Sequence, residues 1–427
     1  MSAAAPPRPA VEAALDMMLS SSTFSGAPRL RRFLELIVRY ALDGEGDRLK
    51  EYTLGLEVFE RGLRFDPKCD AIVRVEALKL RKKLLEYYRT EGVADLVTIS
   101  LPKGSYQPRF DARDDVPSSI LEDPERLCGQ VESLSGQSSP QALERAQHLL
   151  DRALECWPDN PGLHLSLATT ILATIEMELV APIDAMPRLK QSATRTLQLD
   201  PLRHEAHLYA ALPRIIEHDK TAALTGASRA LRAAPRSAIA HYWMASACAA
   251  DLRLSDMLMH MRLAVRLQPH TLFFQTWTAV ALFWAGHPHA AIRHLRDILL
   301  VEPADALAGQ WLAQMLSYME RHDEAHEAAA QAYAAVPTAQ AQAVLGFVYS
   351  RAGRVESAES VLHSLRQTAA TRFVAGSRMA AIEVALGRLA SAADTLRRGR
   401  HQGDWHLAWA RGDQRWEPLR GHVAGVT

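Results

Sequence analysis

The chain has 427 residues, 48% of them hydrophobic, and a formal net charge of zero. This length exceeds what one hydrophobic core supports, so we expect two or more folding units. No apolar run approaches the ~18 residues of a membrane-spanning helix, and the N-terminus lacks the pattern of a signal peptide. Four widely spaced cysteines form no C-x-x-C pair, which predicts free thiols. Together these features favour a cytoplasmic protein that is not associated with a membrane.

The N-terminal part is mildly basic, because residues 1–110 hold 18 Lys and Arg residues against 15 Asp and Glu residues. Residues 1–28 form an N-terminal arm with one short amphipathic helix, VEAALDMML. From Arg29, apolar residues recur on one helical stripe up to Ala41. A second helix is predicted from Lys50 to Phe59.

A third helix, in CDAIVRVEALKLRKKLLEYYR, is the most informative segment of this part. Asp70 is its predicted N-cap. Apolar residues at steps of three or four predict one buried stripe: Val73, Ala77, Leu80, Leu84 and Tyr88. Basic residues occupy much of the remaining surface: Arg74, Lys79, Arg81, Lys82 and Lys83. The next segment, LVTISLPKGSYQPRF, predicts a β-hairpin with Lys103 and Gly104 at its tip.

Three helices and a hairpin, with a basic third helix, resemble a winged helix-turn-helix. The pattern V-x-V-x-A-x-K-L-R-K-K-L from Val73 and the later LPKGSY resemble the recognition helix and wing of OmpR/PhoB-type DNA-binding domains. This resemblance covers residues 29–110, but the four-stranded sheet that precedes the family's helices is missing. It implies that double-stranded DNA is contacted by these residues: Arg74, Glu76, Leu78, Lys79, Arg81, Lys82 and Lys103. Taken alone, the basic face is also typical of an ordinary solvated helix.

After a linker at 111–140, residues 141–427 contain a repeat. Prolines fall at intervals of 34 residues: Pro201, Pro235, Pro269, Pro303 and Pro337. Alanines recur where paired helices must approach closely, and Gly353 and Gly387 stand where a tight turn is needed. These marks resemble tetratricopeptide repeats, whose period is about 34 residues.

The resemblance implies an α-helical solenoid. Helical hairpins are predicted at 203–235, 237–269, 271–303, 305–337, 339–368 and 372–400. An earlier helix and hairpin occupy 141–201, with LVAPIDAMP as a widened loop, and DWHLAWARGDQRWEPLRGHV is predicted to cap the last hairpin. Aromatic residues cluster in the central hairpins, mostly as core, and one or two are expected to line a groove for a partner peptide.

No pattern of residues indicates catalysis. His322 and His326 have the spacing of the zinc-binding H-E-x-x-H motif, but Asp follows the first histidine, and we interpret both as surface residues. The chain has no phosphate-binding glycine loop and no nucleophile paired with a base. We therefore expect a protein that is not an enzyme and needs neither metal nor cofactor.

The fold class predicted is mainly α: a winged helix followed by a tetratricopeptide solenoid. A fusion of this kind resembles HilA-type bacterial transcriptional activators. This implies a DNA-binding regulator whose solenoid forms a homodimer or receives a protein partner or effector. The alternative is a scaffold for protein–protein interaction in which the N-terminal module binds no DNA.

Overall fold

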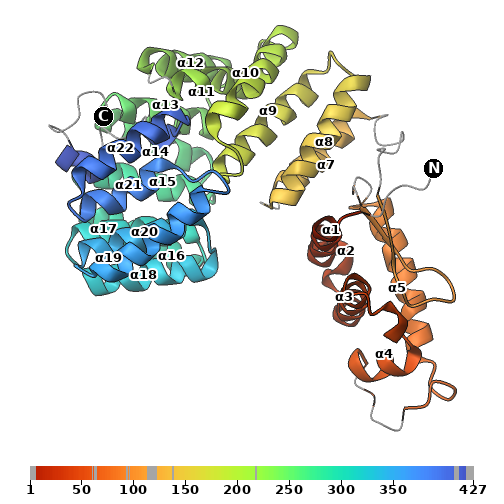
Figure 1. Ribbon diagram of the computed structural model, residues 1–427. Helices are drawn as coiled ribbons and strands as arrows, with labels where there is room; N and C mark the ends of the chain where they lie inside the picture. Colours follow the sequence, from red (N-terminus) through yellow and green to blue (C-terminus); the bar gives the residue numbers. More distant parts are fainter. Residues whose placement is uncertain are drawn as a thin grey trace. The chain divides into compact units, whose positions relative to one another are not determined.

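The computed structural model describes residues 6–59, 61, 65–92, 95, 97–112, 123–136, 139–216, 219–407 and 413–419. The chain divides into two units, residues 1–166 and 167–427, which we describe separately (Figure 1). This division lies at residue 166, whereas the sequence places the start of the solenoid at residue 141. Among the described helices, none is both long and apolar enough to cross a membrane.

The first unit begins with helices and continues into a β-hairpin. Its elements are α1 (Arg8–Ser20), α2 (Ser22–Ser25), α3 (Pro28–Leu42), a 3-10 turn (Gly46–Arg48), α4 (Glu51–Glu57), α5 (Ile72–Arg89), β1 (Val97–Ser100) and β2 (Arg109–Ala112). The strands pair antiparallel, with Val97 opposite Ala112. The predicted order of three helices and a hairpin is therefore present. The described residues contain only these two strands, and the assignment to a winged helix stays a prediction.

One apolar core joins α3, α4 and α5. The predicted stripe of α3 faces inward, and Phe33, Leu34 and Ile37 are fully buried. Phe33 packs edge-to-face on Phe59, with 5.5 Å between the ring centroids. Burial of such large side chains is the main source of stability in a module of this size.

The buried stripe of α5 differs from the prediction at its end. Four predicted residues are buried, but Tyr88 is only half-buried, and Tyr87 packs edge-on against Phe24 instead. The helix begins at Ile72, and the carboxylate of Asp70 accepts a hydrogen bond from the Ile72 N–H at 3.0 Å. Asp70 thus satisfies a free N–H group at the helix start, but the N-cap is Ala71, one residue after the predicted position.

Two further helices, α7 (Pro124–Gly136) and α8 (Pro140–Cys156), complete the first unit. The segment predicted to be a linker is therefore helical at 124–136. α8 packs against α7 and α1, and its Arg145 forms a buried ion pair with Asp95. This contact fixes α8 on the N-terminal module.

The second unit consists of antiparallel helix pairs, which run from green to blue in Figure 1. After α9 (Pro161–Glu176), which crosses the division, the helices are α10 (Pro182–Leu199), α11 (His204–Ile216), α12 (Lys220–Ala233), α13 (Ala238–Ala250), α14 (Leu254–Leu267), α15 (Leu272–Trp284), α16 (Pro288–Val301), α17 (Ala306–Tyr318), α18 (His322–Ala335), α19 (Ala339–Arg351), α20 (Val355–Ala369), α21 (Gly376–Ala385) and α22 (Leu389–His401). The six hairpins predicted between residues 203 and 400 are confirmed. The widened loop predicted at 179–187 is wrong in its second half, because Pro182 starts a helix at its first position.

The 34-residue period appears in hydrogen bonds as well as in helix positions. A side chain six residues after a repeat proline lies within hydrogen-bonding distance of that proline's carbonyl oxygen. The pairs are His207 with Pro201 at 3.0 Å, His241 with Pro235 at 3.2 Å and Gln275 with Pro269 at 2.6 Å. Each contact ties the end of one hairpin to the first helix of the next.

The turns inside the hairpins also repeat, each with one residue in the left-handed backbone region. These residues are Leu252, Gly286, Glu320, Gly353 and Gly387, with φ between 60° and 85°. Glycine adopts this conformation without strain, whereas an L side chain does so at a cost of about 1–2 kcal/mol. The sequence predicted the turns at Gly353 and Gly387, whereas Leu252 and Glu320 adopt the same backbone conformation at this cost.

The superhelix of the second unit brings its first and last hairpins together. Glu178, in the loop between α9 and α10, forms a nearly buried ion pair with Arg378 of α21 at 2.5 Å. Beside it, the Ile183 N–H donates to the Gln402 carbonyl oxygen at 3.2 Å. The solenoid therefore closes on itself.

The C-terminal segment, described at 404–407 and 413–419, packs inside this closed solenoid. Leu407, Trp416 and Leu419 share a core with α21 and α22, as a cap of the last hairpin would. Trp405 extends beyond this core, and the centroid of its ring lies 6.3 Å from that of Trp243 in α13. The segment thus covers more than the last hairpin. Residues 408–412 and 420–423 of the predicted cap lie outside the described residues.

Candidate functional site

The exposed face of α5 combines cations with apolar side chains. Lys79 is 59% exposed and lies 2.7 Å from the carboxylate of Glu76. Val75, Leu78 and Leu85 expose about half of their surface on the same helix. Lys82 lies between them and is also exposed. This face is accessible and suited to a partner with both anionic and apolar groups.

Two of the residues that the family resemblance placed at DNA have other positions. Glu76 is only 6% exposed, so it belongs to the buried side of α5 and does not point into a groove. Arg81 donates hydrogen bonds to the carbonyl oxygens of Leu101 (2.9 Å), Pro102 (3.0 Å) and Ser105 (3.0 Å). Its guanidinium group therefore holds the loop of the hairpin against α5, and its contact with phosphate stays a prediction.

The remaining predicted residues lie at the surface. Arg74 donates to the Pro67 carbonyl oxygen at 2.7 Å and lies 3.6 Å from the Glu51 carboxylate. Lys103 is exposed in the hairpin loop, next to Gly104, whose φ of 82° permits the tight turn. The structure brings Lys79, Lys82 and Lys103 to the surface of one module. Their contact with DNA stays a prediction.

An aromatic ladder follows the first helices of successive hairpins in the solenoid. Its members are spaced 34 residues apart: Tyr209, Trp243, Trp277 and Trp311. Trp277 and Trp311 meet edge-to-face, with 5.7 Å between centroids, and both are half-buried. We call the surface formed by these first helices the inner surface. The sequence showed the aromatic cluster, but the ladder becomes visible only when the repeat period is applied to it.

A cavity of about 100 Å³ lies on the inner surface beside this ladder. Its wall includes Trp277 and Trp311 from α15 and α17, Phe347 from α19, and Arg415 from the C-terminal segment. The Arg415 guanidinium lies 5.9 Å from the centre of the Trp311 ring, which is within the range of a cation–π contact. The cavity is large enough for one side chain of a partner.

The C-terminal segment also brings a histidine to this cavity. Burial, with a contribution from Arg378, lowers the pKa of His406 to about 3. His406 is therefore neutral at physiological pH. No sequence pattern indicates this residue, because its environment depends on the closure of the solenoid.

The histidine pair with zinc-protease spacing forms no metal site in the described chain. His326 lies 3.3 Å from the Tyr349 hydroxyl group, and its ring is tilted against that aromatic ring. Across the described ranges, no three His, Cys, Asp or Glu side chains converge as a metal would require. His326 therefore has a packing role between neighbouring hairpins.

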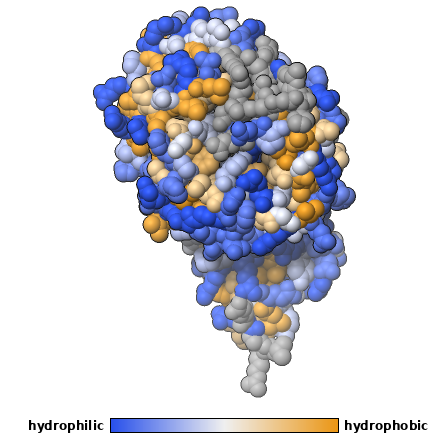
Figure 2. Space-filling model, turned by 90° about the vertical axis from the view of Figure 1, so that its left-hand side faces the viewer, coloured by the Kyte–Doolittle hydropathy of each residue, from blue (hydrophilic) through white to orange (hydrophobic). Residues whose placement is uncertain are grey.

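On the face of the solenoid drawn in Figure 2, hydrophobic residues appear in several small areas between hydrophilic ones. Such dispersed apolar surface is ordinary for a protein exterior and marks no single docking patch. The inner surface, with its aromatic ladder and cavity, is thus the stronger candidate for partner binding in this unit.

No family model and no curated protein matches the chain. Solved helical-repeat proteins do match. A human IFIT1 dimer with m7Gppp-AAAA aligns over 99% of this chain and 96% of that chain, with 12% identity and a TM-score of 0.51. A tetratricopeptide repeat protein from Parabacteroides merdae covers 74% of this chain and 98% of its own, with 11% identity and a TM-score of 0.43. YrrB, described as a TPR protein with an unusual peptide-binding site, covers 44% and 92%, with 16% identity and a TM-score of 0.31.

At these identities the likeness concerns the fold alone. The chain contains a tetratricopeptide-type helical solenoid, as the 34-residue period predicted. These matches give no support to an OmpR/PhoB-type winged helix or to a likeness with HilA-type activators.

Proposed function

We propose that the protein is a binding scaffold, not an enzyme, and that its solenoid holds a partner polypeptide on the inner surface. One observation carries this proposal: the aromatic ladder stays half-buried at Trp277 and Trp311, beside a small cavity. Half-buried tryptophans supply a large apolar area at little entropic cost, and they dominate the binding energy of many interfaces. The adjoining Arg415 pairs with Asp413 and retains further N–H groups that could donate to a peptide backbone.

Peptides selected from a random display library against the full chain test this proposal. Their affinity for the Trp311→Ala variant should fall about ten-fold or more, as for a central aromatic residue of an interface. The matched control is Trp157→Ala, which removes a 43% exposed tryptophan from the first unit. Equal losses in the two variants, or no loss in either, would contradict binding at the inner surface.

A second candidate function is DNA binding by the N-terminal module. It rests on the exposed cations Lys79, Lys82 and Lys103 and on the order of three helices and a hairpin. Such a protein would act in the cytoplasm as a transcriptional regulator, and a homodimer would double its phosphate contacts. Titration of duplex DNA at several salt concentrations tests this candidate, because phosphate contacts produce a steep salt dependence.

The full chain is required for that titration. A fragment that ends near residue 115 would lack α8, and Asp95 would lose the buried ion pair with Arg145. If the full chain shows no salt-dependent binding to any duplex, the DNA-binding candidate is wrong and the scaffold remains.

A further inference from the structure

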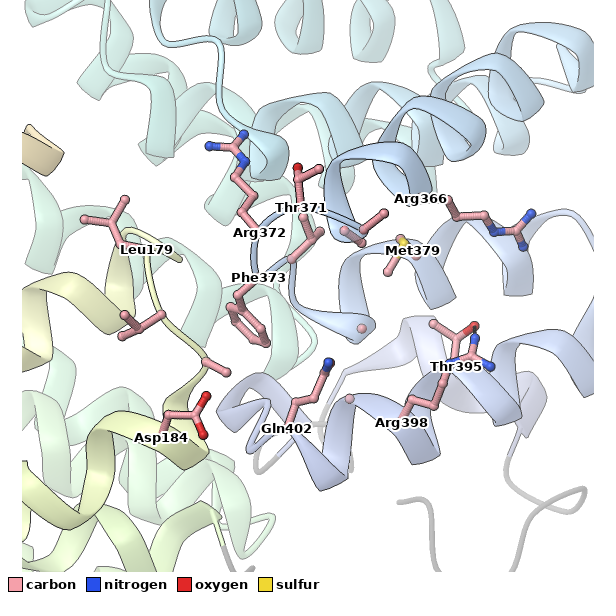
Figure 3. A pocket seen from close by; sticks show the side chains of 17 residues that line it. Leu179, Asp184, Arg366, Thr371, Arg372, Phe373, Met379, Thr395, Arg398 and Gln402 are labelled. Carbon is pink, nitrogen blue, oxygen red and sulfur yellow. Dashed lines mark hydrogen bonds between the residues drawn. The ribbon is translucent and has the colours of Figure 1, made fainter. Parts of the chain in front are cut away.

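A second and larger cavity, of about 620 Å³, lies where the two ends of the solenoid meet (Figure 3). Its wall combines the loop after α9 with the end of α20, the loop before α21, and α22. These segments are almost 200 residues apart in the sequence, so the cavity exists only when the solenoid is closed. Its size is within the range of about 300–1,000 Å³ that is usual for small-molecule sites.

The contacts beside the cavity hold its two sides together. The ion pair between Glu178 and Arg378 is only about a tenth exposed. Glu178 has a left-handed backbone, with a φ of 57°. A non-glycine residue in this region carries backbone strain, and residues strained in this way concentrate at functional sites. A ligand that touches both sides would add to these contacts and favour the closed solenoid.

The cavity is cationic. Three arginines line it, Arg366, Arg372 and Arg398, against one carboxylate, Asp184. Arg366 donates to Glu383 at 2.7 Å, and Arg398 donates to the Thr395 hydroxyl at 3.2 Å, so each retains further N–H groups. The Arg372 guanidinium group makes no hydrogen bond or ion pair within the described part of the chain, whereas its backbone N–H donates to the Thr368 carbonyl oxygen at 3.0 Å. The excess of guanidinium groups favours an anionic ligand.

The cavity wall also includes an aromatic ring and uncharged or acidic polar groups, which offer a different kind of contact. In Figure 3, the ring of Phe373 lies at the centre, with Asp184 and Gln402 below it and Leu179 beside it. Arg366 and Arg372 extend from the edge, and Arg398 lies next to Thr395 on the far side. An aromatic ring next to a carboxylate and an amide suits a planar heterocycle with exocyclic N–H groups.

We infer that this cavity binds a nucleoside polyphosphate, with the base against Phe373 and the phosphates among Arg366, Arg372 and Arg398. Asp184 accepts a hydrogen bond from the base, and Gln402 can both donate and accept one. This site is separate from the inner surface and does not depend on partner binding there.

Isothermal titration calorimetry of the full chain with ATP, GTP, adenosine and inorganic tripolyphosphate tests the inference. At least one of the two nucleotides should bind with a one-to-one ratio, and more tightly than adenosine or tripolyphosphate. The variant Arg398→Ala should weaken that binding about ten-fold or more, since it removes a charge-assisted contact. Its control is Arg397→Ala, the neighbouring residue, which is 60% exposed, pairs with Asp394 and does not line the cavity.

A second variant, Phe373→Leu, keeps the cavity wall apolar but removes the ring. It should weaken nucleotide binding and leave tripolyphosphate binding unchanged. Circular dichroism melting of each variant without ligand confirms that it is folded. The inference is overturned if neither nucleotide binds at about millimolar concentration, if tripolyphosphate binds as tightly as the nucleotides, or if Arg397→Ala and Arg398→Ala lose binding equally.

Discussion

Arg145 of α8 and Asp95 form an ion pair whose side chains are only 4% and 0% exposed. Arg145 also donates to the Glu91 carbonyl oxygen at 2.5 Å. A charge removed from water in this way is tolerated only when its partner is present, because desolvation alone is expensive. The pair therefore makes the N-terminal module and α8 one folding unit.

The first prediction concerns this pair. Arg145→Ala should destabilise the first unit by about 3–5 kcal/mol, because it leaves the buried Asp95 carboxylate without the positive charge of Arg145. Denaturant unfolding, followed by hydrogen exchange in α1 and α8, measures the loss. The control is Arg152→Ala on the same helix, whose ion pair with Glu155 is exposed and should contribute less than about 1 kcal/mol. Similar losses in the two variants would contradict the account.

The second prediction concerns Arg81. Arg81→Ala removes three hydrogen bonds to the hairpin loop, so amide exchange should accelerate at 97–112 while α3 stays protected. Lys83→Ala serves as the control, since its partner Glu86 lies on the same helix. If the hairpin exchanges at the same rate in both variants, Arg81 does not hold it.

The third prediction concerns Lys103 and belongs to the DNA-binding candidate. If the hairpin tip contacts phosphate, Lys103→Ala should weaken binding about equally on all duplexes and reduce the salt slope by about one. The hairpin itself should remain intact, because Lys103 is exposed. A loss on one sequence only, with an unchanged slope, would indicate a base contact instead.

The fourth prediction concerns the close packing of the solenoid. Ala329 of α18 is 1% exposed, so Ala329→Leu should overpack the hairpin and destabilise it by about 1–3 kcal/mol. Because each repeat contacts mainly its neighbours, loss of protection should concentrate near 306–351. The control is Gln331→Leu, on the exposed side of the same helix. Even loss of protection throughout the second unit would argue against a linear array.

The fifth prediction follows from the lowered pKa of His406. The ordinary value is 6.5 and the folded value is about 3, so between these values the unfolded chain binds more protons than the folded chain. Stability of the second unit should therefore fall as the pH is lowered from about 6.5, by at most about 1.4 kcal/mol per pH unit. His406→Gln should flatten this dependence, and His401→Gln, at an exposed position, should not. An unchanged pH profile in His406→Gln would show that other groups control it.

The period of the prolines predicted the solenoid well, because each proline ends a helix for local reasons that need no tertiary information. The same local reasoning located α3, α4 and α5. It failed at Tyr88, where the choice between two adjacent tyrosines depends on Phe24, a residue far away in the sequence. Local sequence patterns thus located the helices, but they did not determine which side chains of each helix are buried.

The candidate sites were less predictable. Arg81 looked like a surface cation, because the sequence does not show that the hairpin loop folds back onto it. The large cavity could not be predicted at all, since Asp184 and Arg398 meet only through closure of the superhelix. Closure of the superhelix results from small rotations between successive repeats. The sequence of a single repeat does not reveal these rotations.

The central claim is that the inner surface of the solenoid holds a partner polypeptide. Hydrogen exchange of the full chain, with and without a display-selected peptide, tests it most directly. We predict new protection in α15 and α17, at 272–284 and 306–318, and none in α3 or α5. Protection confined to the N-terminal module, or to the outer helices α16 and α18, would contradict the claim.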